Sequence, residues 1–329
     1  MARRLPSSLV LAAVLLAAAA AGCATSKGAV SAADKAAIKR ADDDAESLFS
    51  RGRTLREEGR WSEARKAFTA VYEDYPSSPL AGEAQFQAAE CAHGDGRFYA
   101  AGHAFARYIE DRPLSPHVDV VEKRMYEIGD FLIEDGRRGL WGTGIFSSEE
   151  DGVEILRRLA SLLATGSYAD DALMRLGRYF AGERQWAEAE APLDQLLRDY
   201  PASEWRLEAR FLLAWTYRKD NRGPEYDGEK LRRARAHFLA FVAAASSDAD
   251  RSAEYAERLA AARAEVEAID ADLARKYLAR ARLYRRMDRP AAALFVLQEA
   301  ARQWGTTEPG QDAARQAEAM APAGGGNRE

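Results

Sequence analysis

Residues that could support catalysis or bind a metal are few and widely scattered along the chain. There are four histidines, His93, His103, His117 and His237. None belongs to an HExxH pattern, and none has a cysteine at the spacing of a zinc ligand set. Cys91 lies in the string AAECAH, where a thiol among small residues is typical of helix packing, not of a nucleophile. We therefore predict no catalytic site, no metal site and no cofactor, and a protein that is not an enzyme.

Two other kinds of segment could be mistaken for binding sites. The glycines of GLWGTG at 139–144 lack both the preceding strand and the GK[ST] ending of a phosphate-binding loop, which favours an insertion loop. Acidic runs at 42–44 and 149–151 lie at predicted helix starts, where carboxylates stabilise the helix dipole. The formal net charge of −5 argues against a nucleic-acid partner, because phosphate binding depends on basic surface.

Cys23 carries the clearest chemical prediction. It follows Arg3, Arg4 and an apolar run over 9–21, which is too short to span a bilayer and is typical of a secretory signal peptide. The string LLAAAAAGCATS resembles a bacterial lipobox. In such lipoproteins the cysteine thiol receives a diacylglycerol, the signal is cut before it, and the new N-terminus is acylated with palmitate. The resemblance predicts a lipoprotein signal peptide at 1–22 and lipidation of Cys23; the alternative is ordinary cleavage beside an incidental cysteine.

Both ends of the mature chain have compositions that cannot bury a core. Residues 23–44 are mostly Ala, Ser, Gly, Lys and Asp, and the C-terminus ends in APAGGGNRE. Segments so poor in large apolar residues remain unfolded because they gain too little from burial. We predict a flexible tether at 23–44 and a disordered tail at 308–329.

Composition favours helices for the remainder. The chain has 68 alanines, whereas Ile and Val together number 18. Alanine has the highest helix propensity, and strands prefer β-branched and aromatic residues. We predict an all-α fold.

A period of about 34 residues organises this helical part. The strings GRWSEARKAFTAVYEDYP (59–76) and ERQWAEAEAPLDQLLRDYP (183–201) share a layout that resembles the tetratricopeptide repeat. In that repeat, small residues at positions 8 and 20 let two antiparallel helices touch, and a proline at position 32 ends the second helix. Three copies fill these positions with Gly52, Ala64 and Pro76; with Ala89, Ala101 and Pro113; and with Gly177, Ala189 and Pro201. Position 17 is aromatic in all three, as Trp61, Phe98 and Trp186.

Three weaker units extend the pattern to about five or six helix pairs. We divide them into N-terminal repeats at 45–165 and C-terminal repeats at 166–307. Because 248–286 contains neither Gly nor Pro, we expect one long helix there, or two nearly continuous ones. Pro192 should bend its helix or delay its start.

One insertion, RRGLWGTGIFSS at 137–148, interrupts the third unit with large apolar residues. These are Leu140, Trp141, Ile145 and Phe146. They either fold back into the solenoid groove or form an exposed patch for a partner or a lipid surface, with Trp141 and Phe146 as the candidate contacts.

The whole pattern resembles the outer-membrane assembly lipoprotein family of BamD. The resemblance rests on the repeat ends VYEDYPSSPLAGEAQF and LLRDYPASEWRLEARF, and on the order of DGEKLRRARAHFLAFV, a long helix and YLARARLYRRMDRPAAALFVLQEA. It implies a lipid-anchored scaffold at the outer membrane, facing the periplasm, within the β-barrel assembly machinery. The implied partners are a BamA-like barrel protein of the Omp85 class and unfolded outer-membrane proteins. The alternative is another envelope adaptor of this repeat class, linked to peptidoglycan or division.

Candidate binding residues within the first two repeats are Arg51, Gln85 and Glu90. They lie on the predicted first helices, where stacked helix pairs present a groove able to hold an extended or helical segment. Solvated surface positions are the other interpretation of these three residues.

Overall fold

The structure, a computed structural model, describes residues 32–138, 148–220, 228–247 and 249–321. The described part is all-helical, with no strand among those residues. Most of it forms six helix pairs: α2 (Ala32–Glu57) with α3 (Trp61–Asp74), α4 (Ala81–Gly94) with α5 (Phe98–Asp111), α6 (Val118–Arg138) with α7 (Ser148–Leu162), α8 (Ala169–Gly182) with α9 (Trp186–Asp199), α10 (Arg206–Lys219) with α11 (Gly228–Ala245), and α13 (Ala256–Arg286) with α14 (Pro290–Trp304). The helical-repeat solenoid predicted from the sequence is confirmed.

Small residues at position 8 determine how closely the helices of a pair approach. A Cβ on Gly52 would lie 2.8 Å from the ring of Phe68, and one on Gly177 would lie 2.4 Å from Cδ2 of Leu193. At such distances a methyl group would force the side chain of Phe68 or Leu193 to move. The large residue at position 24 therefore packs directly on the backbone of the first helix, which explains the period seen in the sequence.

The turns between paired helices also repeat. Gly59, Gly96, Arg184 and Asp288 all have positive φ, between 54° and 74°. Each lies seven residues after the small residue at position 8, so each occupies position 15 of its repeat. The left-handed turn at Asp288 shows that α13 and α14 form a repeat in the same register, although their sequence matches the pattern weakly.

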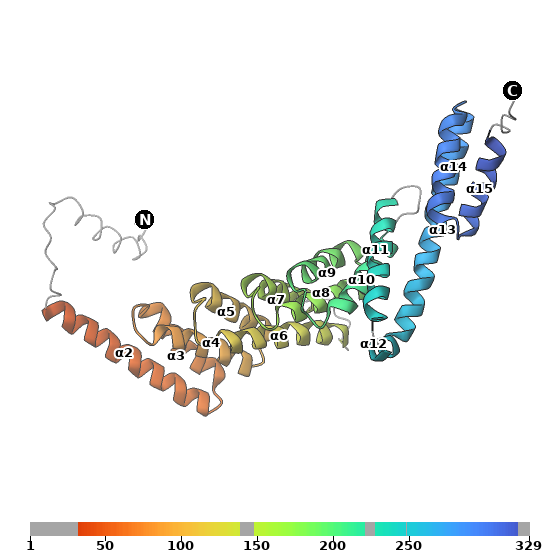
Figure 1. Cartoon of the computed structure of the whole chain (residues 1–329). Coiled ribbons are helices and arrows are strands. Elements are labelled where there is room, and N and C mark those ends of the chain that lie inside the picture. The colour runs from red at the N-terminus through yellow and green to blue at the C-terminus, as the bar shows by residue number, and fades with distance from the viewer. Residues whose placement is uncertain (1–31, 139–147, 221–227, 248, 322–329) are drawn as a thin grey trace, which may run out of the picture.

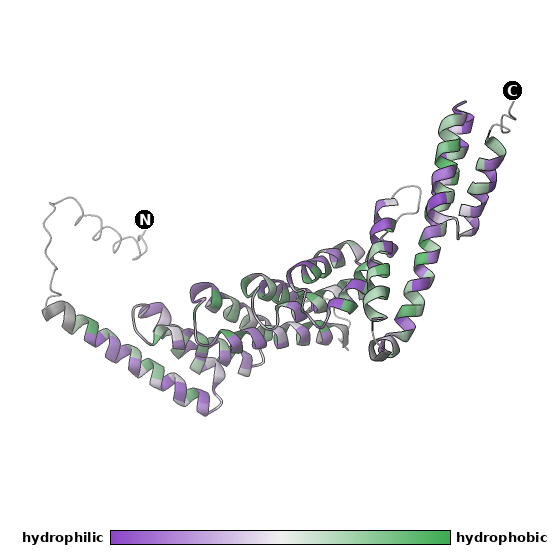
Figure 2. Cartoon of the chain, in the orientation of Figure 1, coloured by the Kyte–Doolittle hydropathy of each residue, from purple (hydrophilic) through white to green (hydrophobic). Residues whose placement is uncertain are grey.

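The pairs stack into two adjoining hydrophobic cores. One lies among α2, α3 and α4 and includes Phe68 and Cys91, both fully buried. The other runs from α4 to the C-terminal α15 (Glu308–Met320) and includes Phe86 at its start and Ala317 at its end. Because α4 contributes to both cores, the first repeats are joined to the rest. Figure 2 shows hydrophobic and hydrophilic residues side by side along each helix, as expected for helices that each bury a face.

The predicted long helix is present in two parts. Tyr255 separates the short α12 (Ala249–Glu254) from α13, which is 31 residues long. The beginning of α13 packs beside α11, and its distal half packs with α14 and α15. Helices α13, α14 and α15 form an arm that projects away from the row of helices α2–α11 (Figure 1). Among the described residues, no helix has the length and apolar character to cross a membrane.

Both predictions of unfolded ends are wrong in part. Helix α2 begins at Ala32, within the predicted tether, because adding residues to a helix already anchored by Ala45 needs no core of its own. Helix α15 occupies the predicted tail from Glu308 to Met320. Thr307 accepts a hydrogen bond from the backbone N–H of Gly310 at 3.1 Å, and Ala313 and Ala317 are buried. Because alanine can be buried where helices touch, a segment without large apolar residues can still fold.

Of the two effects expected of Pro192, the delayed helix start is not observed. Helix α9 begins at Trp186, as in the other pairs, and continues through Pro192 to Asp199. The start is therefore not delayed. Pro192 is buried, so its ring contributes to packing in place of the hydrogen bond it cannot donate.

Candidate protein-binding face

The first helices of successive pairs are bonded to one another along one side of the solenoid. We call the surface formed by α2, α4, α6, α8 and α10 the A face (Figure 1). Arg124 Nε on α6 donates to Glu90 Oε1 on α4 at 3.2 Å, and Arg178 Nη2 on α8 donates to Glu208 Oε2 on α10 at 2.8 Å. Further links between first helices are Arg56–Gln87, Arg175–Asp130, Arg175–Glu134 and Arg218–Glu265.

The sequence separation of these links reflects the repeat. Glu83–His117, Glu90–Arg124 and Asp171–Trp205 each join residues 34 positions apart, which is one repeat length. Asp130 and Arg175 are 45 residues apart because the insertion lies between them. The A face is thus a regular polar lattice that fixes each pair against the next.

The predicted binding residues have different environments on and near this lattice. Arg51 is exposed on α2. Gln85 is buried, donates from Nε2 to Asp111 Oδ2 at 2.7 Å and accepts a hydrogen bond from Arg112. Glu90 is half-buried and bonded to Arg124, as described above. Gln85 and Glu90 therefore have structural partners, and of the three only Arg51 is solvent-exposed.

Three further predicted sites, Cys23, Trp141 and Phe146, lie outside the described residues. Lipidation of Cys23 and the two alternatives for the 137–148 insertion remain predictions.

The aromatic residue at position 17 lines a pocket in two repeats. Trp186, the first residue of α9, forms a pocket of about 340 Å³ with residues of α8 and α10. There Lys219 Nζ lies 4.7 Å from the ring centre of Trp215. Trp61 takes the same position in a pocket of about 310 Å³ between α2 and α4, beside Arg56 and His93. These pockets offer aromatic surface beside charged groups, an arrangement suited to side chains of a bound polypeptide.

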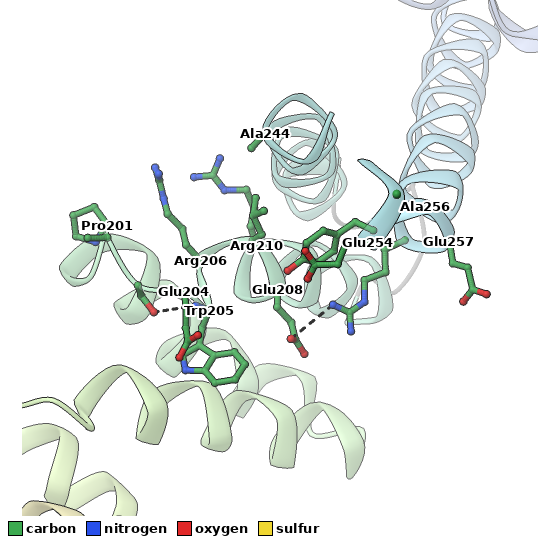
Figure 3. A pocket seen from close by; sticks show the side chains of 16 residues that line it. Pro201, Glu204, Trp205, Arg206, Glu208, Arg210, Ala244, Glu254, Ala256 and Glu257 are labelled. Atoms are coloured by element: carbon green, nitrogen blue, oxygen red, sulfur yellow. Dashed lines mark hydrogen bonds and ion pairs between the residues drawn. The ribbon is translucent and has the colours of Figure 1, made fainter. Parts of the chain in front are cut away.

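A larger cleft, of about 1190 Å³, lies where the row of pairs meets the arm (Figure 3). It is lined by the α9–α10 turn, the first turns of α10 and the α12–α13 junction. Figure 3 shows Arg206 and Arg210 extending to one side of α10, whereas Trp205 and Glu208 extend to the other. Glu208 forms ion pairs with Arg178 at 2.8 Å and Arg258 at 3.7 Å.

Arg210 has a perturbed environment within this cleft. Burial, and next the positive charge of Arg206, lower the pKa of its guanidinium below the usual value. Its Nε is buried without a hydrogen-bond partner among the described residues. Nothing in the sequence outlined this cleft, because its walls come from segments as far apart as 201–210 and 253–258. The spacing of Arg206 and Arg210 by four residues was the available signal, since it places both on one helix face.

Cys91 and His117, whose side chains could in principle support catalysis, are held in packing contacts. Burial raises the pKa of the Cys91 thiol to about 11, so this buried cysteine is a weak nucleophile at neutral pH. The ring of His117 stacks on Phe86 with centres 4.0 Å apart, and its Nε2 lies 2.6 Å from Glu83 Oε2. No group of three or more His, Cys, Asp and Glu residues within the described ranges is arranged to hold a metal ion.

Comparisons with known proteins agree with this geometry. Tetratricopeptide-repeat family models match residues 26–79 and 49–116, and again 171–203. These ranges contain the three copies with the strongest pattern. No curated protein matches the chain in sequence.

Solved structures of repeat proteins are similar at low identity. A tetratricopeptide repeat protein from Parabacteroides merdae is 13% identical over 84% of this chain and 99% of its own, with a TM-score of 0.31. Pseudomonas aeruginosa pilF is 14% identical over 84% and 99% of the two chains, with a TM-score of 0.28. The TPR2AB domain of yeast Sti1, in its pHSP90 complex, is 14% identical over 84% and 96%, with a TM-score of 0.22. Since all three TM-scores are below 0.5, the assignment rests on the family models and on the packing of the helix pairs. Tetratricopeptide repeats are therefore identified at residues 26–116 and 171–203, within a solenoid of paired helices.

Proposed function

We propose that this protein is a lipid-anchored scaffold of the outer-membrane β-barrel assembly machinery, facing the periplasm. Its partners would be a BamA-like barrel protein of the Omp85 class and unfolded outer-membrane proteins. The observation that carries the proposal is the combination in one chain of a lipobox-like Cys23 with a repeat solenoid. The 31-residue α13, which is the first helix of the last pair, supports it because a long helix at this place is part of the resemblance to the BamD family.

The A face supplies a physical basis for holding a polypeptide. The bonds between first helices keep the pairs in a fixed order, so little conformational entropy need be lost when a segment binds. The pockets at Trp61 and Trp186 lie apart along the row, in the first pair and in the fourth. An extended segment could place aromatic side chains in both, and barrel strands are rich in such residues.

The partner is tested by purification from the native membrane. The full-length protein with a C-terminal affinity tag is isolated from detergent-solubilised outer membranes, and the co-purifying proteins are identified by mass spectrometry. Recovery of an Omp85-type barrel protein is the expected result. Recovery of peptidoglycan-binding or division proteins without any Omp85 protein would contradict the proposal and support the envelope-adaptor alternative.

The role is tested by depletion. Because porins need the assembly machinery to enter the membrane, their level in the outer membrane is expected to fall as the protein is depleted. Unaltered porin levels after complete depletion would show that the assembly function is wrong.

The A face is tested by charge reversal in the Trp186 pocket. Lys219→Glu places a carboxylate beside Trp215 and removes the cation from its ring, so binding of an unfolded barrel polypeptide is expected to weaken about tenfold. Arg107→Glu on α5 is the matched control, because that exposed arginine lies on a second helix away from the A face. Equal binding by the two variants would argue against this surface.

A further inference from the structure

The distal end of the arm is strongly basic. Residues 275–289 contain seven basic side chains and one acidic side chain, Asp288, although the whole chain has more acidic than basic residues. Figure 1 shows that the turn from α13 to α14 lies at the free end of the arm, far from α2. The positive charge is therefore concentrated at one extremity of the molecule.

These basic groups are available to a partner. Five arginines here are exposed, namely Arg280, Arg282, Arg285, Arg286 and Arg289. None of the five forms an ion pair with a carboxylate within the part of the chain that the structure describes. On the A face, by contrast, four arginines of the first helices are bonded to acidic residues, namely Arg124, Arg175, Arg178 and Arg218. The contrast indicates that acidic side chains of the described residues do not neutralise the positive charge at this end of the arm.

Apolar side chains are exposed among the arginines. Leu283 is 45% exposed, Met287 is 50% exposed and Phe295 on α14 is 68% exposed. Leu283 and Met287 are four residues apart, so they lie on the same side of α13, with Arg280 one turn before Leu283. We call this surface the arm tip; it consists of Arg280, Arg282, Leu283, Arg285, Arg286, Met287, Arg289 and Phe295.

We propose that the arm tip binds the surface of an anionic lipid bilayer. Basic residues close to an anionic membrane are each attracted to it, and apolar side chains between them can enter the headgroup region. Arginine suits this position because its long stem can lie along apolar surface while the guanidinium reaches the phosphates. The contact goes beyond the proposed assembly function and would be separate from the lipid on Cys23.

The shape of the surface favours a bilayer over a groove in another protein. The tip is the end of the α13–α14 hairpin at the free end of the arm (Figure 1), and none of the three pockets described above includes its residues. Its three exposed apolar side chains are outnumbered by five exposed arginines, whereas the centre of a protein interface is depleted of charged residues. A projecting, basic surface with few apolar residues matches a flat, charged membrane.

The experiment measures vesicle binding by the full chain carrying Cys23→Ala, so that no acyl chain on that residue contributes. Sucrose-loaded vesicles are made of phosphatidylcholine alone or with about one third phosphatidylglycerol, and bound protein is measured after sedimentation. The test variant has Arg282, Arg285, Arg286 and Arg289 replaced by Gln. The control variant carries the same change in charge at exposed arginines elsewhere, namely Arg53, Arg97, Arg107 and Arg198.

Binding is expected to require phosphatidylglycerol and to weaken with salt, because the attraction is electrostatic. The arm-tip variant should bind about 10³-fold more weakly, given about 1 kcal/mol for each of four basic residues at the surface, and the control should bind like the parent. Replacing the four arginines with Lys should keep most of the binding. Circular dichroism checks that all variants are folded.

The proposal is overturned if parent and arm-tip variant bind anionic vesicles equally, or if phosphatidylcholine vesicles bind as well as anionic ones. It is also overturned if the parent binds polyglutamate but not anionic vesicles, since an acidic polypeptide would then be the partner. Loss of barrel assembly in the depletion experiment tests the proposed function separately and does not affect this result.

Discussion

At the scale of single residues, the turn between paired helices depends on the backbone conformation of one residue and not on its side chain. In four helix pairs, the residue at position 15 has a left-handed backbone conformation. It is glycine in two of these pairs, as Gly59 and Gly96. Residues with a Cβ adopt this conformation at a cost of about 1 kcal/mol. Arg184 and Asp288 accept that cost, because the turn geometry is imposed by the packed helices on either side.

Gly96→Ala is therefore expected to lower the free energy of unfolding by about 1 kcal/mol. Nothing lies within 4 Å of the added Cβ, so the loss would come from backbone conformation alone. Arg184→Ala at the same position of another repeat is the control, because the residue there already has a Cβ and the change should be small. The measurement is urea unfolding followed by circular dichroism. Equal losses in both variants would contradict the explanation.

Glu122 is a buried carboxylate whose ionisation should affect stability. It is 2% exposed and accepts a hydrogen bond from the backbone N–H of Tyr168 at 2.6 Å. Burial is the largest effect and raises the pKa of Glu122 above 4.5, although hydrogen bonds from Tyr168 and Ser167 oppose it. The folded state then binds the proton more tightly than the unfolded state, so stability decreases as pH rises from 4.5 through the folded-state pKa.

Glu122→Gln should remove this dependence, because the amide oxygen can still accept the hydrogen bond but cannot ionise. We expect the variant to lose less free energy of unfolding than the parent as the pH is raised from 4 to 8. Urea unfolding at each pH gives the comparison, and exposed Glu46→Gln is the control. Parallel curves for parent and Glu122→Gln would contradict the assignment.

At the scale of elements, the junction between α10 and α13 decides how the arm is held. Arg218 Nε donates to Glu265 Oε2 at 2.9 Å, and its Nη1 lies 3.1 Å from Asp272 Oδ2. All three side chains are less than a quarter exposed, so water screens them incompletely. One residue of α10 thus fixes two successive turns of α13.

Arg218→Ala should cost about 1–3 kcal/mol, since two partly buried carboxylates lose their cation. Faster amide hydrogen exchange is expected in the first half of α13, while α4–α7 remain unchanged. Arg198→Ala is the control, because that arginine forms an exposed pair with Asp194 at 3.0 Å, of a kind worth less than about 1 kcal/mol. Unchanged exchange in α13 would show that apolar packing alone holds the arm.

The C-terminal helix α15 covers the last pair. Ala313 and Ala317 are buried, as are Leu297 and Trp304 of α14, and all four belong to the same core. Terminal repeats need such a cover because their outer apolar face would otherwise meet water.

A chain that stops after Gly305 is expected to expose this core. We predict a lower melting temperature and increased binding of the dye ANS, with the N-terminal repeats still helical. A chain that stops after Ala321 retains α15 and serves as the control. Equal melting of the two truncated chains would contradict a covering role.

At the scale of the whole molecule, the solenoid places two kinds of surface far apart. The A face extends along the first five pairs, and the arm tip lies beyond the α10–α13 junction (Figure 1). A scaffold of this form can hold a polypeptide along one region while another region makes a separate contact. The proposed anchor at Cys23 precedes α2, at the end of the chain opposite the arm.

Cys23→Ser should release the protein from the outer membrane if lipidation is its anchor. Several acyl chains bind a bilayer firmly, and each buried CH₂ contributes about 0.8 kcal/mol. We expect no incorporation of labelled palmitate into the variant and its recovery from the soluble fraction in high salt. High salt is included because it suppresses contact through the arm tip. Labelling equal to that of the parent would show that Cys23 is not the site.

Much of the fold follows from local sequence. Small residues at positions 8 and 20, the aromatic residue at 17 and the proline at 32 predicted the strong repeats, because contact within a helix pair involves residues close in sequence. The prediction of unfolded chain was wrong for residues 32–44 and 308–320, which have few large side chains but are helical. Whether an alanine-rich segment folds depends on the surface that it meets, and composition does not contain that information.

The sequence by itself therefore determined the helical repeats, their order and the long helix before the last pair, and it motivated the anchor at Cys23 as a prediction. Only the tertiary structure decided which polar residues are free. Gln85 and Glu90 are bonded across helices, whereas the arginines from 280 to 289 have no carboxylate partner among the described residues. The reason is physical: a charged side chain is available for binding only if no neighbouring helix supplies its counter-charge. Those neighbours lie on other helices, 26 residues away along the chain for Gln85 and 34 for Glu90.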